Sequence, residues 1–151
     1  MPIQLVPTVL QDFELELSDA MLNVEGEPTT VTIRQATTLE AERRAEVTAK
    51  SATILDEGDG RATKVEHSFN WETLKRFDAM LTLSGCNITD VDGSDLFRFK
   101  EGRDGIKRLA MGEAEFGRAW GKLNDVITEE IHNFILVVNP TWSMKRDDLG
   151  E

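Results

Sequence analysis

Residues 31–46 read VTIRQATTLEAERRAE, and the pattern of side chains changes within this stretch. Up to Arg34 it is rich in Thr, Val and Ile, which favour extended strands. From Thr37 onward it is rich in Ala, Glu and Arg, and Thr37 and Glu40 have the spacing of a capping box that starts a helix. The stretch therefore predicts a strand followed by a surface helix over residues 37–52.

The chain before this stretch predicts a partner for the strand. In residues 12–17, DFELEL, apolar side chains alternate with glutamates, which gives a strand one apolar and one solvated face. Residues 24–28, VEGEP, supply a Gly/Pro turn. We therefore expect residues 1–35 to form a β-hairpin region.

Residues 36–143 are predicted to be mainly helical. A helix should begin with Asn70 as its N-cap and end at Ser84-Gly85, and a loop with a short strand at residues 96–99 should follow. The chain is expected to be helical again from Ile106, and Asn124 should cap the last helix. The apolar stripes of these helices are Trp71, Leu74, Phe77 or Asp78, and Leu81; Phe116, Trp120 and Leu123; and Ile127, Ile131, Ile135 and Val138.

These elements predict one α+β domain over residues 1–143, with the N-terminal β-hairpin packed on a bundle of about four helices and a flexible tail at residues 144–151. The chain has 151 residues, of which 40% are hydrophobic, which is enough for a buried core. It lacks a signal-peptide pattern and any apolar run long enough to cross a membrane, so we expect a soluble protein of the cytoplasm.

Charge is distributed unevenly along the chain, whose net charge is −11. No Lys or Arg precedes Arg34, whereas residues 98–108 contain five cations and two carboxylates. These regions could attract one another within a chain or between copies, so self-association stays open. Net acidity disfavours nucleic acid as a partner, because such binding depends on neutralising phosphates.

The candidate chemical motifs are weak. Residues 90–101 place acids at several calcium-ligand positions, but Asp95 stands where an EF-hand loop needs Gly, so no metal or other cofactor is expected. His67, His132 and the single Cys86 lie in no recognisable nucleophile or zinc motif. We therefore expect a protein that is not an enzyme.

Tryptophans are the more informative residues. Trp71, Phe116 and Trp120 are expected to pack in the core. Trp142 follows the Pro140 break, outside any regular stripe, and either folds back to cap the last helix or contacts a partner.

Three stretches together resemble the tail assembly chaperones of long-tailed bacteriophages. They are residues 31–46, residues 71–88 (WETLKRFDAMLTLSGCNI) and residues 115–142 (EFGRAWGKLNDVITEEIHNFILVVNPTW). The resemblance implies a non-enzymatic protein of the host cytoplasm that binds the tape measure protein, the tail tube protein or both during tail assembly.

The C-terminal helix pair is the expected binding element under this resemblance. Phe116 and Trp120 should face Ile131 and Ile135 of an antiparallel neighbouring helix, joined through Asn124. An apolar edge is then left over for a partner, made of Phe134, Leu136, Val137 and Trp142.

Two other classes of protein remain as alternatives. A virion structural protein, such as a tail tube or tail-completion component, would need most of its chain in strands. An acidic inhibitor that mimics nucleic acid would carry a row of carboxylates along one face. Here the acids are mixed with Lys and Arg after Arg34.

Overall fold

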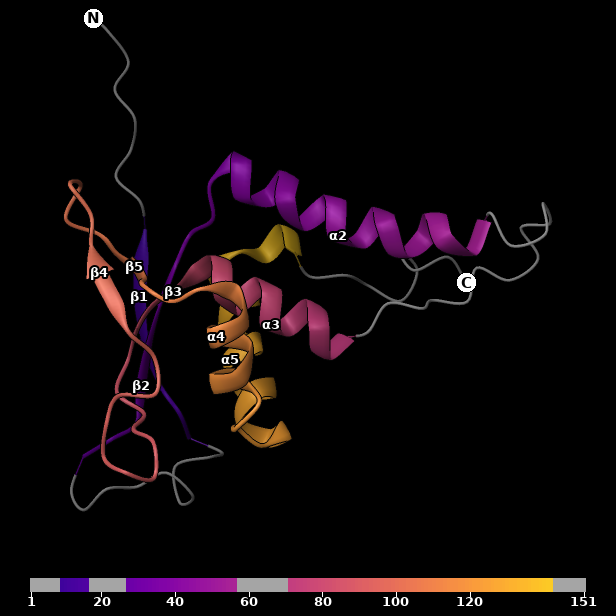
Figure 1. Ribbon diagram of the computed structural model, residues 1–151. Coiled ribbons are helices and arrows are strands. Elements are labelled where there is room, and N and C mark those ends of the chain that lie inside the picture. Colours follow the sequence, from indigo (N-terminus) through magenta and orange to yellow (C-terminus); the bar gives the residue numbers. More distant parts are fainter. Residues whose placement is uncertain (1–8, 17–26, 57–70, 143–151) are drawn as a thin grey trace, which may run out of the picture.

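The computed structural model describes residues 9–16, 27–56 and 71–142, with the backbone alone for residues 49–56. A layer of strands lies against a group of helices (Figure 1). In chain order the elements are β1 (Leu10–Glu14), β2 (Thr30–Arg34), α2 (Thr38–Asp56), α3 (Trp71–Thr82), β3 (Leu83–Cys86), β4 (Phe99–Glu101), β5 (Lys107–Leu109), α4 (Glu113–Trp120), α5 (Asp125–Val138) and the 3-10 turn η1 (Pro140–Trp142). The predicted α+β class, with a β-hairpin and four helices, is confirmed.

The predicted N-terminal hairpin becomes a three-stranded antiparallel sheet in the order β1-β2-β3. The third strand is a correction, because α3 ends at Thr82 and β3 follows at once where a helix end at Ser84-Gly85 was expected. Gly85 makes this pairing close: a Cβ there would lie 3.2 Å from Thr32 Oγ1 on β2. So short a segment forms a strand because it pairs with β2, and the local sequence does not encode this pairing.

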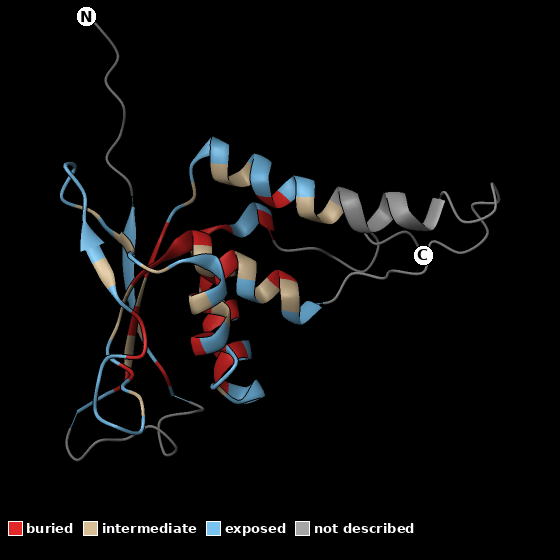
Figure 2. Ribbon diagram, viewed as in Figure 1, coloured by how far each residue is buried: buried red, intermediate tan, exposed pale blue. Residues whose placement is uncertain are grey.

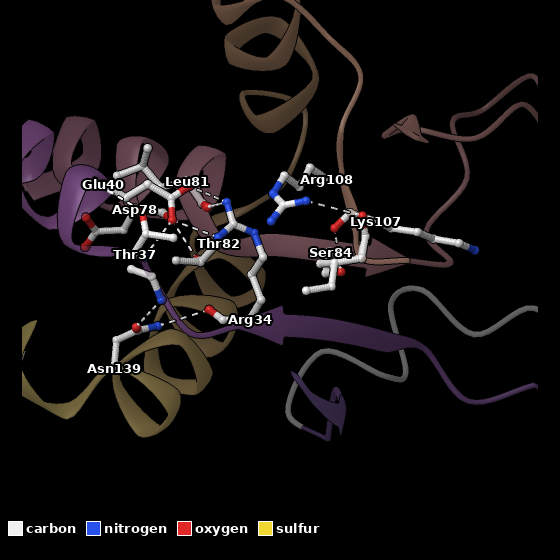
Figure 3. A network of polar contacts seen from close by, with 12 residues as sticks. Arg34, Thr37, Glu40, Asp78, Leu81, Thr82, Ser84, Lys107, Arg108 and Asn139 are labelled. Carbon is white, nitrogen blue, oxygen red and sulfur yellow. Dashed lines mark hydrogen bonds and ion pairs between the residues drawn. The ribbon is translucent and has the colours of Figure 1, made fainter. Parts of the chain in front are cut away.

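A second hairpin, β4–β5, corrects the expected helix from Ile106 and moves the short strand expected at residues 96–99. Its turn closes through a hydrogen bond from Gly102 N to Ile106 O of 2.9 Å. Gly105 in this turn has a φ of +79°, a conformation that L side chains rarely adopt. The hairpin lies beside β3, where Ser84 Oγ donates to Lys107 O at 2.7 Å (Figure 3).

Helix α3 is the centre of the helical group and packs against α2, α4 and α5. α5 also packs on β2. The backbone of α5 lies closer to that of α3 than to that of α4. The expected antiparallel pairing of α4 with α5 stays a prediction. The residues predicted for the two stripes nevertheless share one core, since Phe116, Trp120, Ile131 and Ile135 are all buried.

Buried residues gather where the strands meet α3, α4 and α5 (Figure 2). Along α2, by contrast, Arg44 is the one buried side chain among residues 38–48, which confirms a surface helix. Trp71 is 39% exposed, so its predicted place in the core is wrong, whereas the predictions for Phe116 and Trp120 are confirmed. None of the helices in the described ranges is long and apolar enough to cross a bilayer.

Both predicted helix starts that can be tested are confirmed. Thr37 N donates to Glu40 Oε1 at 2.9 Å, and Glu40 N donates to Thr37 Oγ1 at 3.2 Å, which is a complete capping box. Ile127 N donates to Asn124 Oδ1 at 3.0 Å at the start of α5. Asn70, Leu17, His67 and the predicted tail at 144–151 lie outside the described residues.

Candidate functional site

The most buried charge in the described part of the chain belongs to Asp78 on α3, whose side chain is fully buried. Arg44 of α2 binds it through two nitrogens of its guanidinium: Nε donates to Oδ1 at 2.7 Å and Nη2 donates to Oδ2 at 3.2 Å. His132 Nε2 of α5 lies 3.0 Å from the same Oδ2. The three side chains therefore join α2, α3 and α5, and their geometry is that of a buried ionic network.

Trp142 closes this network from the side of the chain that follows α5. Its carbonyl oxygen accepts a hydrogen bond from Arg44 Nη2 at 3.2 Å, and the Arg44 guanidinium carbon lies 4.8 Å from the centre of its ring. Trp142 is only 6% exposed. Of the two alternatives for this residue, the structure has the one in which η1 folds back onto the helices.

A second polar cluster ties the strands to the helices (Figure 3). Arg34 at the end of β2 is buried, and its guanidinium donates to both carboxylate oxygens of Glu40 and to the carbonyl of Leu81. Asn139, after α5, accepts from Ala36 N at 2.8 Å and donates to Arg34 O at 3.3 Å. The C-terminal end of α5 is therefore fixed to the chain that leaves β2.

The ionisation of Glu40 reflects this cluster. Burial acts to raise the pKa of Glu40, but hydrogen bonds from Arg34 and from the Thr37 backbone outweigh it, and the net shift is downward. Glu40 is thus held as a carboxylate that caps α2 and pairs with Arg34.

These groups do not form a reactive centre. His132 contacts a carboxylate in the way of a catalytic dyad, but His132 is 5% exposed and Asp78 is already bound by Arg44. Burial raises the pKa of the Cys86 thiol to about 12, so the thiolate nucleophile is scarce near neutral pH. The buried polar residues are engaged in holding the elements together.

Two acids of the loop considered as a calcium site, Asp90 and Asp92, have other partners. Asp90 Oδ2 accepts from Lys122 Nζ at 2.6 Å, and this contact lowers the pKa of Asp90. Asp92 Oδ1 accepts from Ser94 Oγ and Ser94 N, at 2.5 and 3.0 Å. Among the residues that the structure describes, no group of three or more side chains is placed to hold a metal ion.

A groove lies between this loop and the turn from α4 to α5, with a volume of about 530 Å³. Its lining is mainly apolar, with the Asp90–Lys122 ion pair at one position. Three aliphatic residues of the lining have little exposed surface: Ile88, Leu96 and Ile127. Val91, also in the lining, is fully exposed. Val126, next to Ile127 in the chain, is 46% exposed. The full lining is Ile88, Thr89, Asp90, Val91, Leu96, Lys122, Leu123, Asn124 and Ile127. A concave apolar surface of this size can accept the side chains of a partner.

The predicted partner-binding residues do not form one exposed edge. Trp142 is buried, as described, and Leu136 is partly buried against the core. Phe134 stacks on Phe13 of β1, with ring centres 4.4 Å apart and planes 9° apart. Val137 alone of the four is well exposed, at 61%. The error arose because the sequence does not show that Phe13 of β1 stacks on Phe134 or that Arg44 of α2 contacts Trp142.

The groove was missed from the sequence because its two sides are about thirty residues apart in the chain. The sequence offered only isolated valines as a signal.

No protein family, no curated protein and no solved structure matches this chain.

Proposed function

We propose that this chain is a non-enzymatic tail assembly chaperone of a long-tailed bacteriophage, which binds the tape measure protein, the tail tube protein or both in the host cytoplasm. The proposal starts from the resemblance of residues 31–46, 71–88 and 115–142 to that family. The observation that carries it is the mainly apolar groove between the 88–96 loop and the α4–α5 turn, whose two charged residues pair with each other.

The chemistry of this groove favours binding over catalysis. Asp90 and Lys122 neutralise each other, and the other lining side chains are aliphatic or neutral. Apolar side chains on one face of an amphipathic helix would fit such a surface, as in other helix-in-groove complexes. The tape measure protein, as a long helical and apolar partner, is the occupant that we propose for this groove.

Co-expression with fragments of the tape measure protein, and separately with the tail tube protein, tests the proposal. Val91→Asp places a charge in the lining of the groove, and Val126→Asp places one next to the lining residue Ile127. Both positions are exposed, so the variants should abolish capture without lowering the melting temperature. Val137→Asp is the control, because Val137 is also exposed, at 61%, but lies at the other end of α5. Its capture should equal that of the wild type.

Two outcomes would contradict this assignment. Loss of capture in Val137→Asp, with normal capture in both groove variants, would move the binding surface to the end of α5. Failure of the wild type to capture either tail protein would reject the chaperone role.

The alternative of a tail tube or tail-completion protein predicts that the chain remains in the purified virion. In the described ranges the helices hold more residues than the strands, which disfavours a tube protein built mainly from strands. Mass spectrometry of purified particles separates the two roles, since a chaperone should be absent from them.

A further inference from the structure

The outer edge of β1 presents unpaired backbone groups. Hydrogen bonds from Leu15 N to Thr29 O (2.8 Å) and from Gln35 N to Val9 O (2.9 Å) show which residues of this strand face β2. In an antiparallel ladder the residues between them direct their N–H and C=O groups to the opposite side. No strand in the described ranges pairs with that side. The residues with outward backbone groups are Leu10, Asp12 and Glu14.

Strand β4 presents a second open edge. Hydrogen bonds from Gly102 N to Ile106 O (2.9 Å) and from Ala110 N to Arg98 O (2.8 Å) bracket the ladder of β4 with β5. By the same alternation, Phe99 and Glu101 direct their backbone groups away from β5. Since β5 lies beside β3, β1 and β4 are the two ends of the strand layer.

The two ends carry opposite charge. The described segment at β1, residues 9–16, contains Asp12, Glu14 and Glu16 and no cation. In the β4–β5 hairpin, Arg98 pairs with Glu115 and Arg108 with Asp104. Three exposed cations of the hairpin have no ion-pair partner among the described residues: Lys100, Arg103 and Lys107.

We propose that copies of this chain associate head to tail, with the β1 edge of one copy adding to the β4 edge of the next. Such an addition would satisfy the open backbone groups of both strands. It would also place the acidic end against the basic end, whereas β1 against β1 would align carboxylates. Val9 and Leu10, which are 49% and 45% exposed, would be covered in the contact. An interface between two different ends gives a closed ring or an open chain of copies.

Charge reversal tests the pairing of the two ends. Analytical ultracentrifugation of the wild type should show oligomers at low ionic strength that dissociate as salt is added, because screening weakens contacts between exposed charges. The double variant Glu14→Lys/Glu16→Lys and the double variant Lys100→Glu/Arg103→Glu should each associate more than about tenfold less tightly. An equal mixture of the two variants should recover association, because each then offers the charge that the other lacks.

A proline variant tests the strand edge without changing charge. Leu10→Pro removes an N–H that points away from β2, so the β1–β2 ladder is kept while the outer edge loses a donor. This variant should melt like Leu10→Ala but associate less tightly. A monomeric wild type, oligomers that survive both charge reversals, or a mixture that stays monomeric would each overturn the proposal. None of these outcomes depends on the groove, so the chaperone role is tested separately.

Discussion

Asp78 shows how one buried carboxylate can hold several helices together. It has no exposed side-chain surface and is shared by Arg44 and His132. In Asp78→Ala the Arg44 guanidinium would remain buried without its partner, and breaking a buried pair in this way costs about 3–5 kcal/mol. Urea denaturation should therefore show a large fall in the free energy of unfolding.

A matched control separates burial from charge pairing as such. Glu115 also forms a two-oxygen contact with an arginine, Arg98, but this pair is exposed to solvent. Glu115→Gln should lower the free energy of unfolding by less than about 1 kcal/mol, as is usual for surface pairs. Equal effects in the two variants would show that Asp78 does not have the role assigned to it.

Cys86 is expected to be unreactive while the protein is folded. Burial raises the pKa of its thiol to about 12, so only a trace of thiolate is present at pH 8. A chromogenic disulfide reagent should modify Cys86 slowly in buffer and rapidly in urea, and absorbance follows both reactions. Rapid modification of the folded protein at pH 8 would contradict this environment for the thiol.

At the scale of elements, η1 returns the chain after α5 to the surface of α2. Trp142→Ala therefore tests the packing of the fold and not a contact with a partner. The variant would empty a buried site and remove the ring beneath the Arg44 guanidinium, so a loss of about 3 kcal/mol or more is expected. Trp120→Ala, at 5% exposure within the core, should show a loss of similar size. Thermal melts compare the two, and a wild-type melting temperature for Trp142→Ala would contradict the docking of η1.

The elements that could be predicted from sequence are those with local signals. Thr37 and Glu40 lie three residues apart and bond to each other, and Asn124 caps a helix that it directly precedes. β3 was missed because its state depends on pairing with β2, far along the chain, and the β4–β5 hairpin was missed because its strands are only three residues long. Gly85, for example, reads as a helix stop but instead lets β3 approach Thr32.

The candidate site was less predictable than the fold for the same reason. The four residues chosen from the apolar end of α5 were reasonable for a helix considered alone. In the folded chain Phe13 covers Phe134, Arg44 contacts Trp142, and Leu136 packs against the core. These contacts are tertiary and cannot be seen in the helix alone. The 530 Å³ groove likewise exists only once the 88–96 loop meets the α4–α5 turn.

At the scale of the whole molecule, polar contacts at the ends of elements reinforce the apolar core between the strand layer and the helices. Arg34 and Asn139 join β2 to α3 and α5, and Glu130 Oε2 of α5 accepts from Glu16 N at 2.7 Å. Arg34 also pairs with the Glu40 carboxylate of α2, whose pKa is lowered on balance by hydrogen bonds from Arg34 and the Thr37 backbone. The attachment of the two layers should therefore depend on pH.

Acid should weaken the fold through Glu40 in particular. Because the folded pKa of Glu40 lies below its ordinary value of 4.5, Glu40 contributes stability above pH 4.5, and this contribution is lost as pH falls through the folded pKa. The free energy of unfolding should fall steadily from pH 4.5 downward. In Glu40→Gln the contribution is absent at every pH, so the difference from the wild type should be largest at pH 7 and shrink in acid. Glu14→Gln, which removes an exposed carboxylate with no described ion pair, should keep the wild-type profile. A constant difference between wild type and Glu40→Gln from pH 7 to pH 3, measured by urea denaturation, would show that the Arg34–Glu40 pair does not link the layers in the way described.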